Sequence, residues 1–377
     1  MSRTNNRQTS TGAKIAAVLL VAAAIILFIA LNFFDEEEYI EQAQLTAIGS
    51  SVPFARNTAG FHAINNGFFM LSENSISFYS NTGQLAMNRP VTGRPAFSGS
   101  GSYIVALEQG GHNAYIFNEH GEAYTATVNS PILNHSLGES GHLILITGNN
   151  HQQTLYLFEP RGQLVITSNL THSNRMPIAS HISNDGRRMA VAFLDFSGAE
   201  LNFIVFLYSI DGNTATLTAS NSYNHNQVLG EMRFINNHLI TVSDKEIRSY
   251  NENGVIVAGV PVDAYITHIS FANSYFAIAL SQNSPNTPGE RPGTVIFYDT
   301  NLNRLSSFES DNRITGLIAN HNAALITSRR ELTAVVSSGS TLWRRIITHD
   351  IIHASFLSST HEIILAGNNS AQIFTIN

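Results

Sequence analysis

Histidine is the side chain in this sequence whose chemistry is simplest to test against spacing. The chain has 15 His and no Cys, and the His are scattered rather than clustered with Asp or Glu. His349 and His353 form the closest pair in the sequence. On one face of a strand they would be separated by two two-residue repeats of about 6.6–7 Å each. Zinc needs all its ligands within bonding distance of one ion. The sequence therefore predicts no metal site, and a site built from His residues of separate blades is the alternative.

Carboxylates are the second candidate chemistry, because a hydrolase or lyase that acts on glycans needs acidic side chains that converge. Asp195, Glu231, Asp263 and Asp299 are far apart in the sequence, so only the fold decides whether they meet. No Ser-His-Asp order, phosphate-binding loop or paired-carboxylate motif stands out. We predict no catalytic residue and no bound cofactor, and a glycan-acting enzyme remains the least favoured alternative.

Two pairs of arginines are the candidate partner-binding residues. Arg329-Arg330 and Arg344-Arg345 are predicted to lie on the third and outer strands of one hairpin, where they would form a positive patch. Such a patch would suit an anionic partner such as a cell-wall polymer. Ordinary ion pairing with Glu331 or with a neighbouring blade is the alternative. The whole chain carries a net charge of −7. It therefore has no basic footprint for nucleic acid.

The elements that must position these side chains come from a recurring hairpin. Each copy is a short apolar run ending in an aromatic, then three small or polar residues, then Gly, which suits a tight turn at positive φ. The copies end at Gly83, Gly121, Gly162, Gly212 and Gly254, and looser copies are at 295–298 (with Leu302 in place of Gly), 334–339 and 372–374. The repeat predicts an architecture of similar units.

The period of this repeat indicates a β-propeller. Successive aromatics at 79, 117, 158, 208, 250 and 298 are 38, 41, 50, 42 and 48 residues apart, and a period of about 40–50 residues is typical of propeller blades or helical arrays. Runs rich in Ile, Val, Phe, Tyr and Thr between Gly, Asn, Asp and Ser clusters favour strands. We predict an all-β fold with WD40-like repeats, with a β-sandwich or a solenoid as alternatives.

One blade is predicted to have four strands, and the chain to have eight blades, with seven as the alternative. In the second blade the inner, second, third and outer strands are expected at 94–97, 103–107, 114–117 and 123–128. The eighth copy lacks an outer strand, for which residues 43–48 are the candidate. The expected blades are 50–90, 91–130, 131–172, 173–220, 221–260, 261–308, 309–348 and 349–377.

An apolar run from Ile15 to Phe34 predicts a transmembrane helix. Its 20 residues would span about 30 Å, one hydrocarbon core. Arg3, Arg7 and Lys14 precede the run and acidic residues 35–38 follow it, so the positive flank is expected in the cytoplasm. A cleaved signal peptide is the alternative, but residues 32–35 (Asn-Phe-Phe-Asp) make a poor small-residue cleavage site. We predict an uncleaved, single-pass signal anchor.

The predicted organisation has four parts. Residues 1–13 form a cytoplasmic tail, 14–34 the transmembrane helix, 35–45 an acidic juxtamembrane spacer, and 46–377 an extracytoplasmic propeller at the cell membrane. Segments 67–124, 129–146 and 180–194 (SHISNDGRRMAVAFL) resemble an uncharacterised family of membrane-anchored propeller proteins of Gram-positive bacteria, the domain of unknown function 5711 family. The resemblance implies location and fold, and it carries over no functional residue.

Trp343 tests a cofactor interpretation. The stretch from Gly339 to Trp343 is similar to one copy of the Gly-x-x-x-Trp docking motif of quinone-dependent dehydrogenases and of an outer-membrane assembly lipoprotein. Those proteins repeat the motif in most blades, whereas Trp343 is the single Trp of this chain. We therefore predict that Trp343 packs inside a blade.

The function that these observations favour is a non-enzymatic binding or scaffold module. The expected partner is a protein or a polymer of the cell envelope, held near the membrane by the anchor. A sensor of a small ligand in the central channel is the first alternative.

Overall fold

The computed structural model describes residues 43–55, 58, 60–91, 95–108, 110–149, 152–170, 174–198, 201–223, 227–282 and 292–377. The chain divides into two compact units, Met1–Ile40 and Glu41–Asn377, and every described residue belongs to the second. The predicted cytoplasmic tail, transmembrane helix and most of the acidic spacer lie outside the described residues. Within the described part, no helix is long and apolar enough to cross a membrane.

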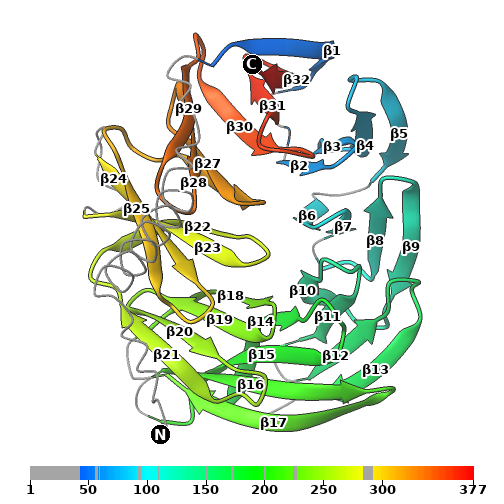
Figure 1. The fold of residues 1–377 in the computed structure, drawn as a ribbon. Coiled ribbons are helices and arrows are strands. Elements are labelled where there is room, and N and C mark those ends of the chain that lie inside the picture. The colour runs from blue at the N-terminus through cyan, green and yellow to red at the C-terminus, as the bar shows by residue number, and fades with distance from the viewer. Residues whose placement is uncertain are drawn as a thin grey trace, which may run out of the picture. The chain divides into compact units, whose positions relative to one another are not determined.

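The second unit is a ring of eight antiparallel sheets of four strands each (Figure 1). Each sheet is one blade, and the prediction of eight blades is confirmed. Seven of the blades use four consecutive strands. Blades 1 to 4 consist of β2 (Gly60–Ile64), β3 (Gly67–Leu71), β4 (Ser75–Ser80), β5 (Leu85–Pro90); β6 (Pro95–Ser100), β7 (Tyr103–Glu108), β8 (Asn113–Asn118), β9 (Gly121–Thr127); β10 (Ile132–Leu137), β11 (Leu143–Gly148), β12 (Gln153–Phe158), β13 (Leu164–Asn169); β14 (Arg175–Ile182), β15 (Arg188–Asp195), β16 (Asn202–Asp211), β17 (Thr214–Ser222).

The other half of the ring has the same order from inner to outer strand. Blades 5 to 8 consist of β18 (Leu229–Ile235), β19 (His238–Ser243), β20 (Glu246–Tyr250), β21 (Ile256–Pro261); β22 (Tyr265–Phe271), β23 (Tyr275–Ser281), β24 (Gly293–Asp299), β25 (Arg304–Ser310); β26 (Gly316–Asn320), β27 (Ala323–Thr327), β28 (Glu331–Val336), β29 (Thr341–Ile346); β30 (Ile351–Phe356), β31 (Glu362–Gly367), β32 (Ser370–Ile376) and β1 (Leu45–Pro53).

The eighth blade is closed by a strand from the other end of the chain. β1 pairs antiparallel with β32, and Leu45 lies opposite Ile376. Gln44 and Asn377 also exchange two backbone hydrogen bonds of 3.1 Å. Residues 43–48 were the predicted closing strand, and the observed strand begins two residues later, at Leu45, and extends to Pro53. This pairing joins the first and last described segments of the ring.

Blades are held together mainly by apolar faces. The second strand of every blade is almost wholly buried, as in β11, where Leu143, Ile144, Leu145 and Ile146 are each 0% exposed. Side chains alternate between the two faces of a strand, so a strand that is apolar at every position must be covered on both sides. Each apolar cluster accordingly lies between two neighbouring blades. The core is therefore a series of layers arranged around the ring.

The recurrent Gly has a geometric role in the turn from third to outer strand. At Gly83, φ is +74°, its N–H donates to Ser80 O at 2.9 Å, and the Ser80 N–H donates to Gln84 O at 2.9 Å. The register between the two strands shifts by one residue next to this turn. The hairpin therefore combines a tight turn with a β-bulge, and this combination needs a residue in the left-handed conformation. Leu302 takes the same place with φ +62°, and its side chain is only 6% exposed. The turn geometry therefore persists there without glycine.

The second blade shows how far the strand predictions hold. The expected inner strand at 94–97 is observed as Pro95–Ser100, because the ladder continues to Ser100 opposite Tyr103. The other three strands match within about two residues at each end. One placement was wrong: Arg329 and Arg330 lie in the turn before β28, whereas Arg344 and Arg345 lie on the outer strand β29 as expected.

Candidate functional site

The ring has two end faces that differ in composition. One end face is formed by the turns from inner to second strands and from third to outer strands, and Gln44 pairs with Asn377 there. We call it the closure face. The other end face is formed by the turns from second to third strands and by the segments that lead from one blade to the next. We call it the crossover face. The candidate site is on the crossover face.

Exposed apolar side chains surround the channel on the crossover face. Five of them lie within two residues of the start of an inner strand, in five different blades, at 38–60% exposure: Leu133, Met176, Val228, Tyr265 and Ile352. Phe196, Leu201 and Ile346 add to this face. The other large exposed apolar side chains of the described residues lie on or directly before outer strands, on the circumference. The crossover face is therefore the apolar end of the ring.

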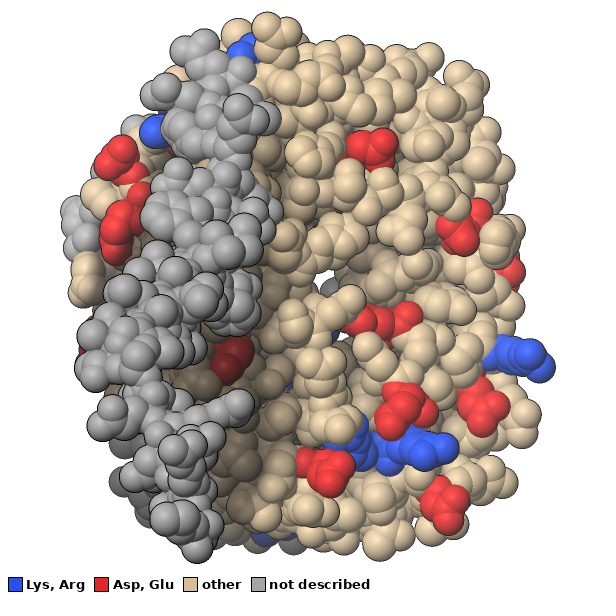
Figure 2. All heavy atoms as spheres, in the orientation of Figure 1, with Lys and Arg blue, Asp and Glu red and all other residues tan. Residues whose placement is uncertain are grey.

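The closure face has a different character. Its turns carry more acidic than basic side chains: Glu119, Glu139, Glu159, Asp185 and Glu252 against Arg161 and Arg187. Figure 2 looks at one end of the ring, where the channel opens in the middle and the visible acidic side chains outnumber the basic ones. The same view is mostly uncharged, which fits a chain in which only 12% of residues are charged.

An apolar hollow of about 500 Å³ lies on the crossover face between blades 5 and 6. Its wall includes the exposed side chains of Val228 (60%) and Tyr265 (51%). The remaining lining comes from Gly230, Val242, Ser243, Asp244, Lys245, Val262, Asp263, Ala264, Ile266 and Ile269. We call this set the apolar hollow.

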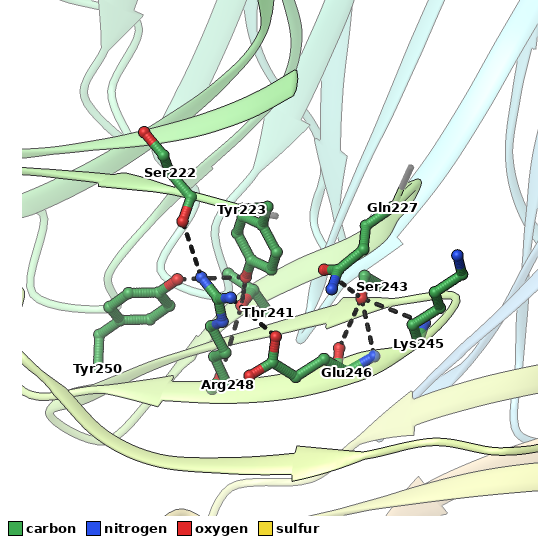
Figure 3. Close-up of polar contacts among 9 residues, drawn as sticks. All are labelled: Ser222, Tyr223, Gln227, Thr241, Ser243, Lys245, Glu246, Arg248 and Tyr250. Carbon is green, nitrogen blue, oxygen red and sulfur yellow. Dashed lines mark hydrogen bonds and ion pairs between the residues drawn. The ribbon is translucent and has the colours of Figure 1, made fainter. Parts of the chain in front are cut away.

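Hydrogen bonds fix the wall of the apolar hollow. The Val228 N–H donates to Asp244 Oδ1 at 2.7 Å, and the Asp244 N–H donates to Val228 O at 3.0 Å. Behind them, the buried Ser243 hydroxyl accepts the Glu246 N–H at 2.9 Å and lies 3.3 Å from Gln227 Oε1 (Figure 3). Val228 is therefore held at the rim, although it is exposed to solvent.

A second group in Figure 3 anchors the same blade to its neighbour. The guanidinium of Arg248, 8% exposed as a side chain, pairs with Glu246 at 2.8 Å and donates to Ser222 O at 3.0 Å. It also lies 4.1 Å above the Tyr223 ring. Tyr223 in turn bonds to the Tyr250 hydroxyl at 3.2 Å and to Thr241. Each side chain of this network has at least one polar partner, as burial requires.

A basic hollow of about 830 Å³ lies on the crossover face between blades 6 and 7. Its lining includes Arg313, Arg329 and Arg330 together with His268, Asn312, Ile314, Thr315, Ser328, Glu331 and Ile346. We call this set the basic hollow. Burial lowers the pKa of His268, and the Arg313 charge acts in the same direction against a backbone hydrogen bond with Thr315. His268 is therefore a neutral hydrogen-bonding group at pH 7.

One carboxylate serves both arginines of the turn. Asp350 accepts the Nε–H of Arg329 at 3.0 Å and that of Arg330 at 2.7 Å. These hydrogen bonds lower the pKa of the Asp350 carboxyl. All three side chains are about half exposed or more. Two positive charges thus share one negative charge, and the site keeps a positive excess.

The other predicted pair of arginines is divided. Arg344 binds both oxygens of Glu331, at 2.6 Å and 3.0 Å, so the alternative of pairing with Glu331 holds for this residue. Arg344 and Arg345 are consecutive in β29 and pair with Thr333 and Leu332. Successive side chains of a strand point to opposite faces, so Arg345 points away from the face that carries Arg344. The fold therefore brings Arg329 and Arg330 together with Arg313. It does not gather all four predicted arginines into one patch.

Inner-strand His residues are part of the links between blades. The His62 ring lies 3.0 Å from Gly101 O, the His135 ring 2.8 Å from the Ser98 hydroxyl, and the His181 ring accepts the Phe234 N–H at 3.3 Å. Each contact joins one blade to the next. Burial lowers the pKa of His181 to about 3. These imidazoles are neutral structural bridges.

Arg233 links blades that are not neighbours. It extends from β18 in blade 5 to Glu139 of blade 3 at 2.7 Å and to the Ser100 hydroxyl of blade 2 at 3.3 Å. This side chain crosses the channel near the closure face. Sequence patterns gave no sign of it, since the contacts join residues 94 and 133 positions apart.

The four candidate carboxylates do not converge. Asp195 pairs with Arg175 at 2.9 Å at the crossover end of blade 4, while Asp299 caps a closure-face turn by accepting the N–H groups of Asn301 and Asn303. These two lie at opposite ends of the ring. Among the described residues, no group of three or more His, Asp or Glu is placed to hold a metal ion.

Trp343 is a packing residue, as predicted. It is 1% exposed within the apolar cluster between blades 7 and 8. Its indole N–H lies 3.4 Å from Thr360 O. A cofactor has no access to this ring.

Eight blades around a channel define the protein as a β-propeller. The chain belongs to a family of unknown function, DUF5711, whose model matches residues 41–376. Among curated proteins, none matches the chain.

Several solved propellers have a similar fold. BamB from Moraxella catarrhalis superposes with a TM-score of 0.53 at 11% identity, over 88% of this chain and 100% of that one. The WD40 domain of Neurospora crassa Pan2 gives 0.53 at 9% identity, over 90% and 97%. Hsv2p from Kluyveromyces lactis gives 0.50 at 9% identity, over 77% and 97%. At these identities the likeness concerns the fold alone.

Proposed function

We propose that this protein is a membrane-anchored, extracytoplasmic binding or scaffold module whose crossover face receives a protein or a polymer of the cell envelope. The observation that carries the proposal is the gathering of exposed apolar side chains and arginines on one end face. An apolar area on the surface of a soluble domain marks an interaction site when it is contiguous and bounded by polar groups. The closure-face turns hold no such gathering among the described residues.

The proposed location rests on the sequence. The apolar run Ile15–Phe34, preceded by basic and followed by acidic residues, supports a single-pass anchor with the propeller outside. Tethering would raise the effective concentration of the binding face near other membrane-bound components. The arrangement needs no catalytic group in the propeller.

The test is site-specific photo-crosslinking in intact cells of the source organism, with the full-length chain. A crosslinking residue replaces Val228 or Ile352 on the crossover face, and matched variants carry it at the exposed Asn253 or His361 on the closure face. A protein that retains residues 1–42 but carries an unrelated domain is the control for capture by the anchor alone.

We expect specific adducts from Val228 and Ile352 and none from the closure-face positions. Adducts that form equally at both faces, or that also form with the unrelated domain, would contradict the assignment of the crossover face. A sensor of a small ligand is the second candidate, favoured by hollow volumes of about 500 and 830 Å³, within the usual range for small-molecule sites.

A further inference from the structure

Two hollows of opposite chemistry lie on the two sides of one strand. Ile269 of β22 lines the apolar hollow, and the preceding residue, His268, lines the basic hollow. Successive side chains of a strand point to opposite faces, and packed sheets are about 10 Å apart. A single ligand that passes over the start of β22 therefore reaches both hollows.

The apolar hollow can accommodate a side chain, and its exposed apolar lining favours an apolar one. Val228 and Tyr265 are more than half exposed at its rim, and Val242, Val262 and Ile266 form its wall. An aliphatic or aromatic side chain that enters it removes apolar surface on both partners from water. Two hydrogen bonds between Val228 and Asp244, one of them accepted by the Asp244 carboxylate, hold the rim in place without the ligand. Binding therefore loses little conformational entropy in ordering the rim.

The basic hollow has unused donors. Asp350 takes only the Nε–H of Arg329 and of Arg330, and each guanidinium has two further NH₂ groups. No other described residue accepts a hydrogen bond from these two side chains. Guanidinium groups bind carboxylates through two parallel hydrogen bonds, so a ligand carboxylate would match both the geometry and the excess charge.

We propose that the crossover face binds one extended peptide segment of a partner protein, with an apolar side chain in the apolar hollow and a carboxylate side chain at Arg329 and Arg330. At about 3.3 Å per residue, three or four residues would separate the two side chains. A phosphate-rich polymer would satisfy the arginines but would leave the apolar hollow empty, and charge complementarity together with an adjoining apolar site favours the peptide. This inference rests on the proposed binding function.

The experiment selects ligands without assuming a sequence. Full-length protein in lipid nanodiscs is exposed to a displayed library of random short peptides, and enriched peptides are synthesised and measured by fluorescence anisotropy. The test variants are the double variant R329A/R330A and the single variant Tyr265→Ala. The control, R161A/R187A, removes the same charge from the closure face. Thermal unfolding shows that each variant is folded.

We expect enriched peptides to combine acidic with aliphatic or aromatic residues at this spacing. Their binding should weaken at least about tenfold in each test variant and stay unchanged in the control. Added salt should weaken binding to the unmodified protein more than to R329A/R330A.

Three results would overturn the inference: no enrichment, enriched peptides that lack acidic residues, or equal losses in test and control variants. Tight binding of inorganic polyphosphate that depends on Arg329 and Arg330, without peptide enrichment, would replace the peptide by a polymer. In each case crossover-face adducts in cells would leave the proposed function standing, whereas their absence would remove that function as well.

Discussion

Leu302 occupies a left-handed backbone position that glycine fills in the equivalent hairpins, and its replacement sets two effects against each other. With φ +62°, a non-glycine residue there costs about 1–2 kcal/mol of backbone energy. The side chain, 6% exposed among Ile235, Ile240 and Tyr298, also contributes packing. Truncating a buried Leu to Ala costs about 3 kcal/mol or more.

The two effects predict an unusual order of stability. Leu302→Ala loses the packing and keeps the strain, so its free energy of unfolding should fall by about 3 kcal/mol. Leu302→Gly loses the same packing but relieves the strain, so it should fall by about 2 kcal/mol. Glycine is therefore expected to be more stable than alanine at this position, although elsewhere in a strand or helix alanine is preferred.

Equilibrium unfolding of the full-length chain in denaturant measures this order. The single Trp343, 1% exposed, serves as the fluorescent probe, and far-UV circular dichroism must give the same transition before free energies are compared. A Leu302→Gly variant less stable than Leu302→Ala would refute the argument, since it would mean that the turn stores no strain that glycine relieves.

Three further predictions concern stability. Burial, with the neighbouring His62 acting in the same direction, lowers the pKa of His353 from 6.5 to about 4. As the pH falls the unfolded state therefore binds the proton first, so the free energy of unfolding should fall by about 2 kcal/mol between pH 7 and pH 5. Melting curves should show a weaker pH dependence in His353→Gln. Gly212 has φ +53° and open space around it, so Gly212→Ala should lower the free energy of unfolding by about 1 kcal/mol. In Gly254→Ala the new Cβ would lie 2.3 Å from that of Ala219, so the loss should be about 1–3 kcal/mol larger. Denaturant titration of the two variants checks this difference. Arg248→Met should cost about 2–3 kcal/mol in the same titration, because it leaves Glu246 unpaired, and equal stability would show that the buried network contributes nothing.

The architecture was predictable because each blade repeats a local pattern. The hairpin ending in Gly83 has the turn, the bulge and the positive φ that its sequence demands, and the same pattern gave the number of blades. The missing outer strand after residue 374 pointed to residues 43–48. Strand ends were less certain, since a ladder such as that of β6 runs on through Gly99 and Ser100, where composition alone indicates a turn.

The candidate site was harder to predict, because it depends on residues from different blades. Arg329 and Arg330 were identified, and ion pairing with a neighbouring blade was one alternative. Their shared partner Asp350, in the connection to the next blade, was not named. The apolar rim had a usable signal: an apolar residue near the start of the inner strand in five blades. That signal becomes visible only when the inner strands are aligned with one another. The Arg233 contact to Glu139 had none.

The pairing of β1 with β32 has a consequence for how the molecule is made. Leu45 and Ile376 are partners across nearly the whole length of the domain, so this contact has the largest loop to close and is expected to form late. During synthesis, β1 emerges first and has no partner until Ser370–Ile376 has been made. Until then the ring is open, with apolar layers on both sides of the gap and an unpaired strand edge, which are the features that lead to aggregation. The nascent protein therefore needs protection for the whole of its translation, and a variant that loses β32 would remain in this open form.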